Sequence, residues 1–184
     1  MHTILKYKII AMVTVFTVTM FFSCKNNFKD IQNIGVLDNG PLSIAENINT
    51  KYTDSGKLKS HLISSKMLNY SNREFAFYEF PEGINLTLFD DDNNRSNIIS
   101  DYAILYDQTD IVDLQGNVVL VTHNNDTLYA EQLFYDQKTE WLFTNSPVKF
   151  VTKEQIINGF GFDSNKDFTK AEVLEMTGII FIDE

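Results

Sequence analysis

The chain has 184 residues, with 15 Lys and Arg against 25 Asp and Glu, which gives a formal net charge of −10. This length suits one domain, with or without a leader, and is enough for a real hydrophobic core. The acidic balance argues against nucleic acid as a partner because phosphates would be repelled, and a hydrophobic fraction of 43% argues against disorder. A single cysteine, Cys24, excludes an intrachain disulfide and a multi-cysteine metal cluster.

The first residues have the layout of a secretory signal. Lys6 and Lys8 precede the apolar run Ile9–Phe22, whose 14 residues are short of the roughly 20 that span a bilayer, and Ser23 stands before Cys24. A small residue directly before a cysteine is typical of a lipoprotein signal. We therefore predict a lipoprotein signal peptide over residues 1–23 and lipidation of Cys24. An uncleaved membrane anchor with an incidental cysteine is the alternative, and both hypotheses tether the chain at the outer side of a membrane.

The segment after the cysteine is polar and has few aromatic residues, which favours a lipid-anchored tether over residues 24–55 and a folded domain over residues 56–184. A short helix within 39–49 is possible on pattern alone. Loss of residues 1–23 would remove two cations and no anion, taking the net charge from −10 to −12. Anionic lipid head groups do not attract so acidic a body, so the anchor itself would hold the protein at the membrane.

From Ser43 onward, short apolar stretches alternate with polar turns, and helical periodicity is scarce. This pattern and the 13% aromatic content favour an all-β fold: a sandwich, a barrel or a jelly roll. The candidate strands are Lys59–Ser64, Lys66–Tyr70, Glu74–Phe80, Ile84–Phe89, Ser100–Asp107, Ile111–Val121, Asp126–Tyr135, Glu140–Thr144, Val148–Val151 and Glu154–Phe162.

An internal repeat supports stacked hairpins. Ile104-Leu105-Tyr106-Asp107 recurs 29 residues later as Leu133-Phe134-Tyr135-Asp136. Turn residues follow each copy at a similar distance, Gly116-Asn117 and then Asn145-Ser146-Pro147, and an apolar strand comes after each turn. Hairpins that wind along one axis in this way form a sheet with two open ends.

Several motifs, in order, carry a family resemblance over about Gly56 to Phe162. They are Glu79–Gly83, Ser100–Ala103, Leu114-x-Gly116-Asn117-Val118-x-Leu120, Leu128-x-Ala130-Glu131-x-Leu133-x-Tyr135-Asp136, Asn145-Ser146-Pro147-Val148 and Gly159-Phe160-Gly161-Phe162. In this order and spacing the sequence resembles the LptC family of lipopolysaccharide export components, especially the lipoprotein-anchored forms of Bacteroidetes-like organisms.

The resemblance implies a twisted β-jelly roll, V-shaped and open-ended, with an apolar groove between two sheets. It also implies a carrier at the periplasmic face of the inner membrane, although the sequence leaves the outer membrane open. Such a carrier accepts lipopolysaccharide from an inner-membrane ABC transporter and passes it to a periplasmic bridge protein of the LptA type, docked edge to edge. In the family a transmembrane helix often takes the place that the signal sequence has in this chain.

We expect the inward face of the groove to carry thirteen apolar side chains: Ile84, Leu86, Leu88, Ile104, Val118, Leu120, Leu128, Leu133, Phe143, Val148, Phe150, Phe160 and Phe162. Leu128 and Leu133 differ in parity along one strand, so this set requires a bend or bulge between them. Residue pattern alone favours an ordinary packed sandwich core, and the resemblance favours the lipid-binding groove.

Enzyme chemistry is not predicted. His61 and His123 are the histidines outside the leader, and no HExxH, GxSxG or phosphate-binding loop occurs. Asp90, Asp92 and Asn94 match the first ligand spacings of a calcium loop, but Arg95 stands where such a loop needs glycine. We therefore predict no cofactor and no metal. The alternatives to a lipid carrier are a lipoprotein that only binds protein partners during assembly and, more remotely, a jelly-roll enzyme acting on carbohydrate.

Overall fold

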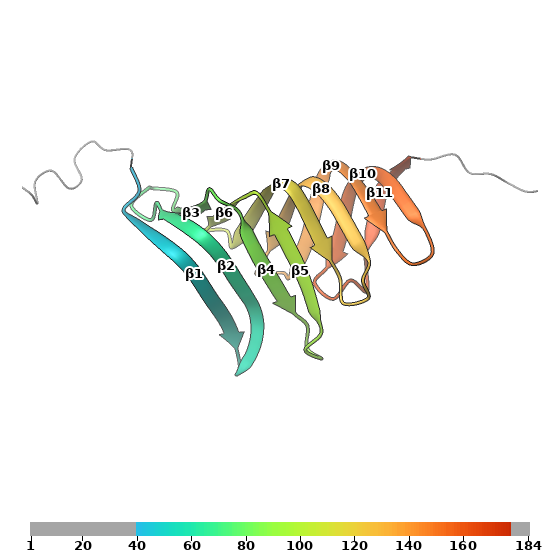
Figure 1. Cartoon of the computed structure of the whole chain (residues 1–184), viewed down its shortest axis with the longest axis horizontal. Coiled ribbons are helices and arrows are strands. Elements are labelled where there is room, and N and C mark those ends of the chain that lie inside the picture. Colours follow the sequence, from blue (N-terminus) through green and yellow to red (C-terminus); the bar gives the residue numbers. More distant parts are fainter. Residues whose placement is uncertain (1–39, 178–184) are drawn as a thin grey trace, which may run out of the picture. The chain divides into compact units, whose positions relative to one another are not determined.

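The structure is a computed structural model that describes residues 40–177, and within this range all regular structure is β, which confirms the predicted fold class (Figure 1). Eleven antiparallel strands form one sheet. They are β1 (Ser43–Asp54), β2 (Lys57–Asn69), β3 (Phe77–Phe80), β4 (Ile84–Phe89), β5 (Arg95–Ser100), β6 (Tyr102–Tyr106), β7 (Ile111–Val121), β8 (Thr127–Asp136), β9 (Trp141–Val151), β10 (Ile156–Asn165) and β11 (Glu172–Thr177).

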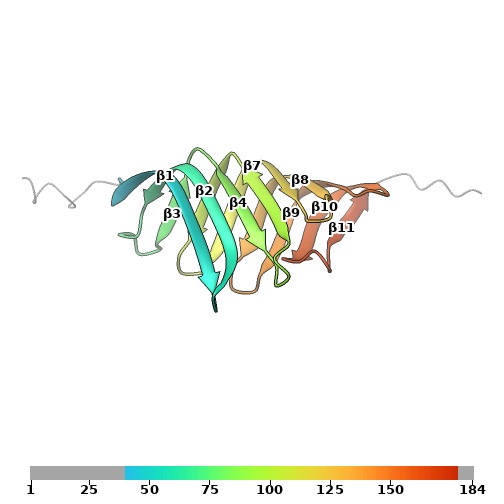
Figure 2. The same cartoon turned by 60° about the horizontal axis from the view of Figure 1, so that its bottom comes forward.

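The sheet folds into two layers because its pairings form a ring. Strands β2, β4, β5, β7, β6 and β3 pair in succession, and β3 returns to β2. Strands β8 to β11 continue from β7, and β1 pairs with β2 at the opposite end. Figure 2 shows β1 and β2 at one end of the roll and β10 and β11 at the other. This arrangement is the predicted jelly roll, whose described sheet has an unpaired edge at each end.

The long strands pass from one layer to the other at a line of bulges. In β7 the pairing register shifts between Gln115 and Val118, where Gly116 and Asn117 have positive φ angles of 73° and 46°. In β8 the register shifts between Ala130 and Phe134, which confirms the bend that Leu128 and Leu133 required. In β10 it shifts at Gly161, whose φ is 81°. Bulges bend a strand and increase its twist, so this line forms the fold between the two layers.

Several sequence-based boundaries differ from the structure. The short helix expected within 39–49 is wrong, because Ser43–Asp54 is the strand β1, paired with β2 along its length. The sheet therefore begins before the expected domain start at residue 56. Asn145-Ser146-Pro147 is a bend inside the continuous strand β9 rather than a turn between two strands. Strands β5 and β11 lie in segments where none was expected.

The inward faces of both layers meet in one apolar core. It includes Leu88, Ile98, Leu114, Leu142 and other side chains that are almost fully buried. Burying each such side chain contributes about 1.5–3 kcal/mol, so this core is the main stabilising feature of the roll.

Gly159 allows the last strand to approach closely. A β-carbon at this position would lie 2.5 Å from the backbone oxygen of Glu175 in β11. The glycine pair thus has two structural roles, since Gly159 permits the close approach of β11 and Gly161 permits the bulge in β10.

Candidate functional site

Ten of the thirteen side chains expected in the groove lie in the interior between the two layers. All ten are at most 8% exposed. They are Ile84, Leu86, Leu88, Val118, Leu120, Leu128, Leu133, Val148, Phe150 and Phe162. The structure thus brings them together in one core, and their contact with lipid stays a prediction.

The other three lie on the outer faces of their strands, which corrects the expected inward orientation. Ile104 and Phe143 are half-buried, and Phe160 is 48% exposed. Strand alternation explains the first two, because their neighbours Ala103 and Leu142 face inward with no exposure. Phe160 and Phe162 have equal parity, but the bulge at Gly161 separates them and only Phe162 faces the core.

An open cavity of about 310 Å³ lies between the two layers at the end of the roll formed by β1 and β2. Its lining comes from both layers: Ile48, Thr50, Tyr52, Ser60, Leu62, Met67, Tyr78, Phe80, Leu86, Leu105, Val112, Tyr135 and Gln137. Leu86 is the one expected groove residue in this set. Sequence reasoning missed the three from β1, Ile48, Thr50 and Tyr52, because it assigned residues 24–55 to a tether. The alternation of Ile48, Thr50 and Tyr52 with polar neighbours was the available signal.

The cavity lining has no charged side chain, although the chain as a whole has a net charge of −10. Burial raises the pKa of the Tyr135 phenol, so this group remains neutral at physiological pH. A cavity with aliphatic and aromatic walls and a few neutral hydroxyl groups is suited to a hydrocarbon chain. An anion would lose hydration there without gaining a countercharge.

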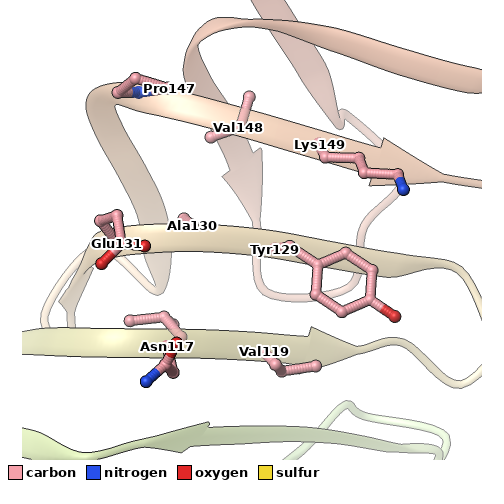
Figure 3. Close-up of a pocket in the computed structure, with 9 residues that line it drawn as sticks. Asn117, Val119, Tyr129, Ala130, Glu131, Pro147, Val148 and Lys149 are labelled. Atoms are coloured by element: carbon pink, nitrogen blue, oxygen red, sulfur yellow. The ribbon is translucent and has the colours of Figure 1, made fainter.

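A second depression lies on the outer face of the sheet. Figure 3 shows it across β7, β8 and β9, with Asn117, Tyr129, Glu131 and Lys149 around it. It measures about 370 Å³. Glu131 and Lys149 are both exposed to solvent, so this depression has a charged rim that the inner cavity lacks.

Within residues 40–177, no group of three or more His, Cys, Asp or Glu side chains is arranged to hold a metal ion. The same residues contain no helix long and apolar enough to cross a membrane. In the loop that shares its first spacings with a calcium loop, Asp90 accepts hydrogen bonds from the backbone N–H groups of Asp92 and Asn94 at 3.0 and 2.7 Å. Its carboxylate therefore stabilises the hairpin tip.

One ionisable pair on the outer face gives the fold a predictable alkaline response. Burial, together with a 2.9 Å hydrogen bond from its hydroxyl to Glu79, raises the pKa of Tyr102 to about 12. The unfolded chain loses this proton near pH 10, so the free energy of unfolding should fall as pH rises from about 10 to about 12. Tyr102→Phe should reduce the slope in that window, as measured by urea unfolding at several pH values. Equal slopes in the two proteins would contradict this assignment.

Comparison with known proteins identifies the family of this chain. A search of curated proteins finds no match, but the family model described as "Lipopolysaccharide-assembly, LptC-related" matches residues 9–180. The chain belongs to the LptC-related family. As a member, it has a role in lipopolysaccharide transport and is a component of the cell envelope.

The LptC family match covers the whole all-β roll, since residues 9–180 include every strand that the structure describes. Cys24 and the predicted signal peptide lie outside the described residues, so the lipoprotein form stays a prediction.

Proposed function

We propose that this LptC-related protein carries lipopolysaccharide by enclosing its acyl chains between the two layers of the jelly roll. In this proposal the lipid arrives from an inner-membrane ABC transporter and leaves to a periplasmic bridge protein of the LptA type. The observation that carries the proposal is the uncharged cavity, which is open at one end of an otherwise acidic molecule.

The energetics of the cavity favour an acyl chain as its occupant. Each CH₂ group removed from water contributes about 0.8 kcal/mol, so a chain in the cavity would gain several kcal/mol from burial alone. A volume of about 310 Å³ is at the low end for small-molecule pockets. Because a lipid with several chains needs more room, its loading would require the two layers to separate further.

The two ends of the sheet provide edges for partner proteins. Among the described residues, β1 pairs with β2 alone and β11 pairs with β10 alone, so each has one unpaired edge. Ile44 on β1 and Met176 on β11 are exposed by 59% and 72%. An unpaired edge with apolar side chains is suited to strand addition by another sheet, which would make the groove continuous between proteins.

Membrane attachment is the second part of the proposal. Lipidation at Cys24 would hold the protein at the periplasmic face of the inner membrane, with residues 25–42 between the lipid and β1. Two or three acyl chains on the anchor would give stable attachment, which the acidic body does not provide by itself.

Site-specific photocrosslinking in cells tests the lipid contact. A photoreactive residue at Leu62, which lines the cavity, should form an adduct with lipopolysaccharide. The matched control is Ile63, the next residue on the same strand, which is 44% exposed on the outer face. Adducts at Ile63 but not at Leu62 would overturn the proposal.

A second candidate, a lipoprotein that only binds protein partners, is favoured by the closed interior around Leu128 and Leu133, neither of which has any exposed surface. Native mass spectrometry of protein purified from its own membranes separates the two functions. A bound mass of lipopolysaccharide size is expected for the carrier and is absent for the assembly factor.

A further inference from the structure

The interior is open at one end of the roll and closed at the other. The cavity reaches solvent beside β1, where Tyr52 is 60% exposed. Further along the roll, Leu120, Leu128 and Phe162 have no exposed surface. A chain bound in the cavity therefore cannot advance toward β11 unless part of the structure moves.

The turn between β10 and β11, residues 166–171, covers the closed part of the interior. Lys166 is only 4% exposed, although it carries a charge, and Phe168 and Ala171 pack against the hydrophobic core. The backbone N–H of Lys166 donates to the oxygen of Glu140 at 2.9 Å, which joins this turn to the neighbouring β8–β9 turn.

Three unfavourable features are concentrated in this turn. The Lys166 ammonium is buried and is compensated by the Glu140 carboxylate at 2.6 Å. Phe168 has a φ of 58°, a left-handed conformation that is rare for a bulky residue. Among the described residues, the buried Oδ1 of Asp167 has no hydrogen-bond partner. Such costs are typical of segments that change conformation during function.

We propose that residues 166–171 form a lid over the groove, held closed by the Lys166–Glu140 ion pair, and that the lid opens to let acyl chains pass toward β11. The inference rests on the proposed lipid transport. It adds the step at which the carrier changes from a closed core to a continuous groove.

The two partners of the ion pair are not equivalent, and this asymmetry defines the test. The Lys166 side chain is 3% exposed, whereas the Glu140 side chain is 46% exposed. Glu140→Gln leaves an uncompensated buried cation that must move into water, so it should open the lid. Lys166→Met removes the buried charge but retains an apolar side chain of similar length, and the exposed Glu140 remains hydrated, so it should close the lid more firmly.

Hydrogen–deuterium exchange on the full-length protein without added lipid measures lid opening directly. The informative amides are those of Lys166 and Phe168, which donate to backbone oxygens at 2.9 and 3.0 Å. Glu140→Gln should speed their exchange roughly tenfold, and Lys166→Met should slow it. Glu79→Gln, which replaces the acceptor of the Tyr102 hydroxyl on the outer face, is the matched control and should leave both amides unchanged. Faster exchange in both pair variants would overturn the lid and indicate ordinary stabilisation of the turn.

Passage of lipid is read out separately with a photoreactive dodecanoic acid analogue. Adducts on cavity peptides containing Leu62 should be equal in all proteins, whereas adducts on peptides containing Leu128 should increase in Glu140→Gln and decrease in Lys166→Met. Cavity adducts with no difference at Leu128 would overturn the lid alone. Absence of cavity adducts in every protein would instead contradict lipid binding, while the exchange data would still decide whether the turn opens.

Discussion

Leu62→Trp should reduce the affinity for acyl chains by at least about tenfold while leaving the protein folded. Leu62 is half-buried and lines the cavity together with Leu86 and Leu105. An indole in this position takes space that an acyl chain would otherwise occupy. Displacing two CH₂ groups costs about 1.6 kcal/mol, which is more than a factor of ten in the dissociation constant.

Titration with a fluorescent fatty acid measures this effect, and complementation of cells depleted of the native protein shows its consequence. Ile63→Trp is the matched control, because Ile63 points to the opposite face of the same strand. Equal affinities for the two tryptophan variants would exclude the cavity as the acyl-binding site.

Leu128→Asp should destabilise the fold by at least about 4 kcal/mol, a large part of the total stability of a domain of this size. Leu128 has no exposed surface and pairs across strands with Leu120 and Phe150. A carboxylate in this place would be buried without a countercharge or a built hydrogen-bond network. Urea unfolding followed by circular dichroism gives the free energy of unfolding.

Tyr129→Asp tests whether burial is the cause of the stability loss expected for Leu128→Asp. Tyr129 is adjacent to Leu128 but is 45% exposed on the outer face, so its replacement should cost little. If both variants lost comparable stability, the alternation of inward and outward faces in β8 would be contradicted. If Leu128→Asp were nearly neutral, this part of the interior would already be open to water, and the lid would not be needed.

Strand alternation explains how much of the site was predictable. In β4 the alternation of Ile84, Leu86 and Leu88 correctly indicates the inward face. Where two neighbours are both apolar, as Leu142 and Phe143 are, the pattern does not indicate which of them faces the core. Where a bulge intervenes, parity reverses, and Phe160 is exposed although Phe162 is fully buried. The pattern predicts that a bend must occur between Leu128 and Leu133, but it does not reveal which residue near Gly161 reverses the face of β10.

The tether assignment failed for a related reason. Strand β1 is largely exposed and pairs with β2 alone, so its inner face carries only the weak alternation of Ile48, Thr50 and Tyr52 rather than a continuous apolar stripe. Its contribution to the cavity, through Ile48, Thr50 and Tyr52, depends on the opposite layer, which closes over it from β3, β6 and β7.

By itself, the sequence determined the acidic character of the protein, its all-β fold and its LptC-related family, because composition, alternation and motif order are local properties of the chain. Only the tertiary structure decided which end of the groove is open. That property arises where distant strands meet: the cavity between β1 and the second layer reaches solvent beside Tyr52, whereas Phe168 and Ala171 in the turn at residues 166–171 pack against the core. The single cysteine marks the predicted anchor, and the folded strands position the site that the anchor would hold at the membrane.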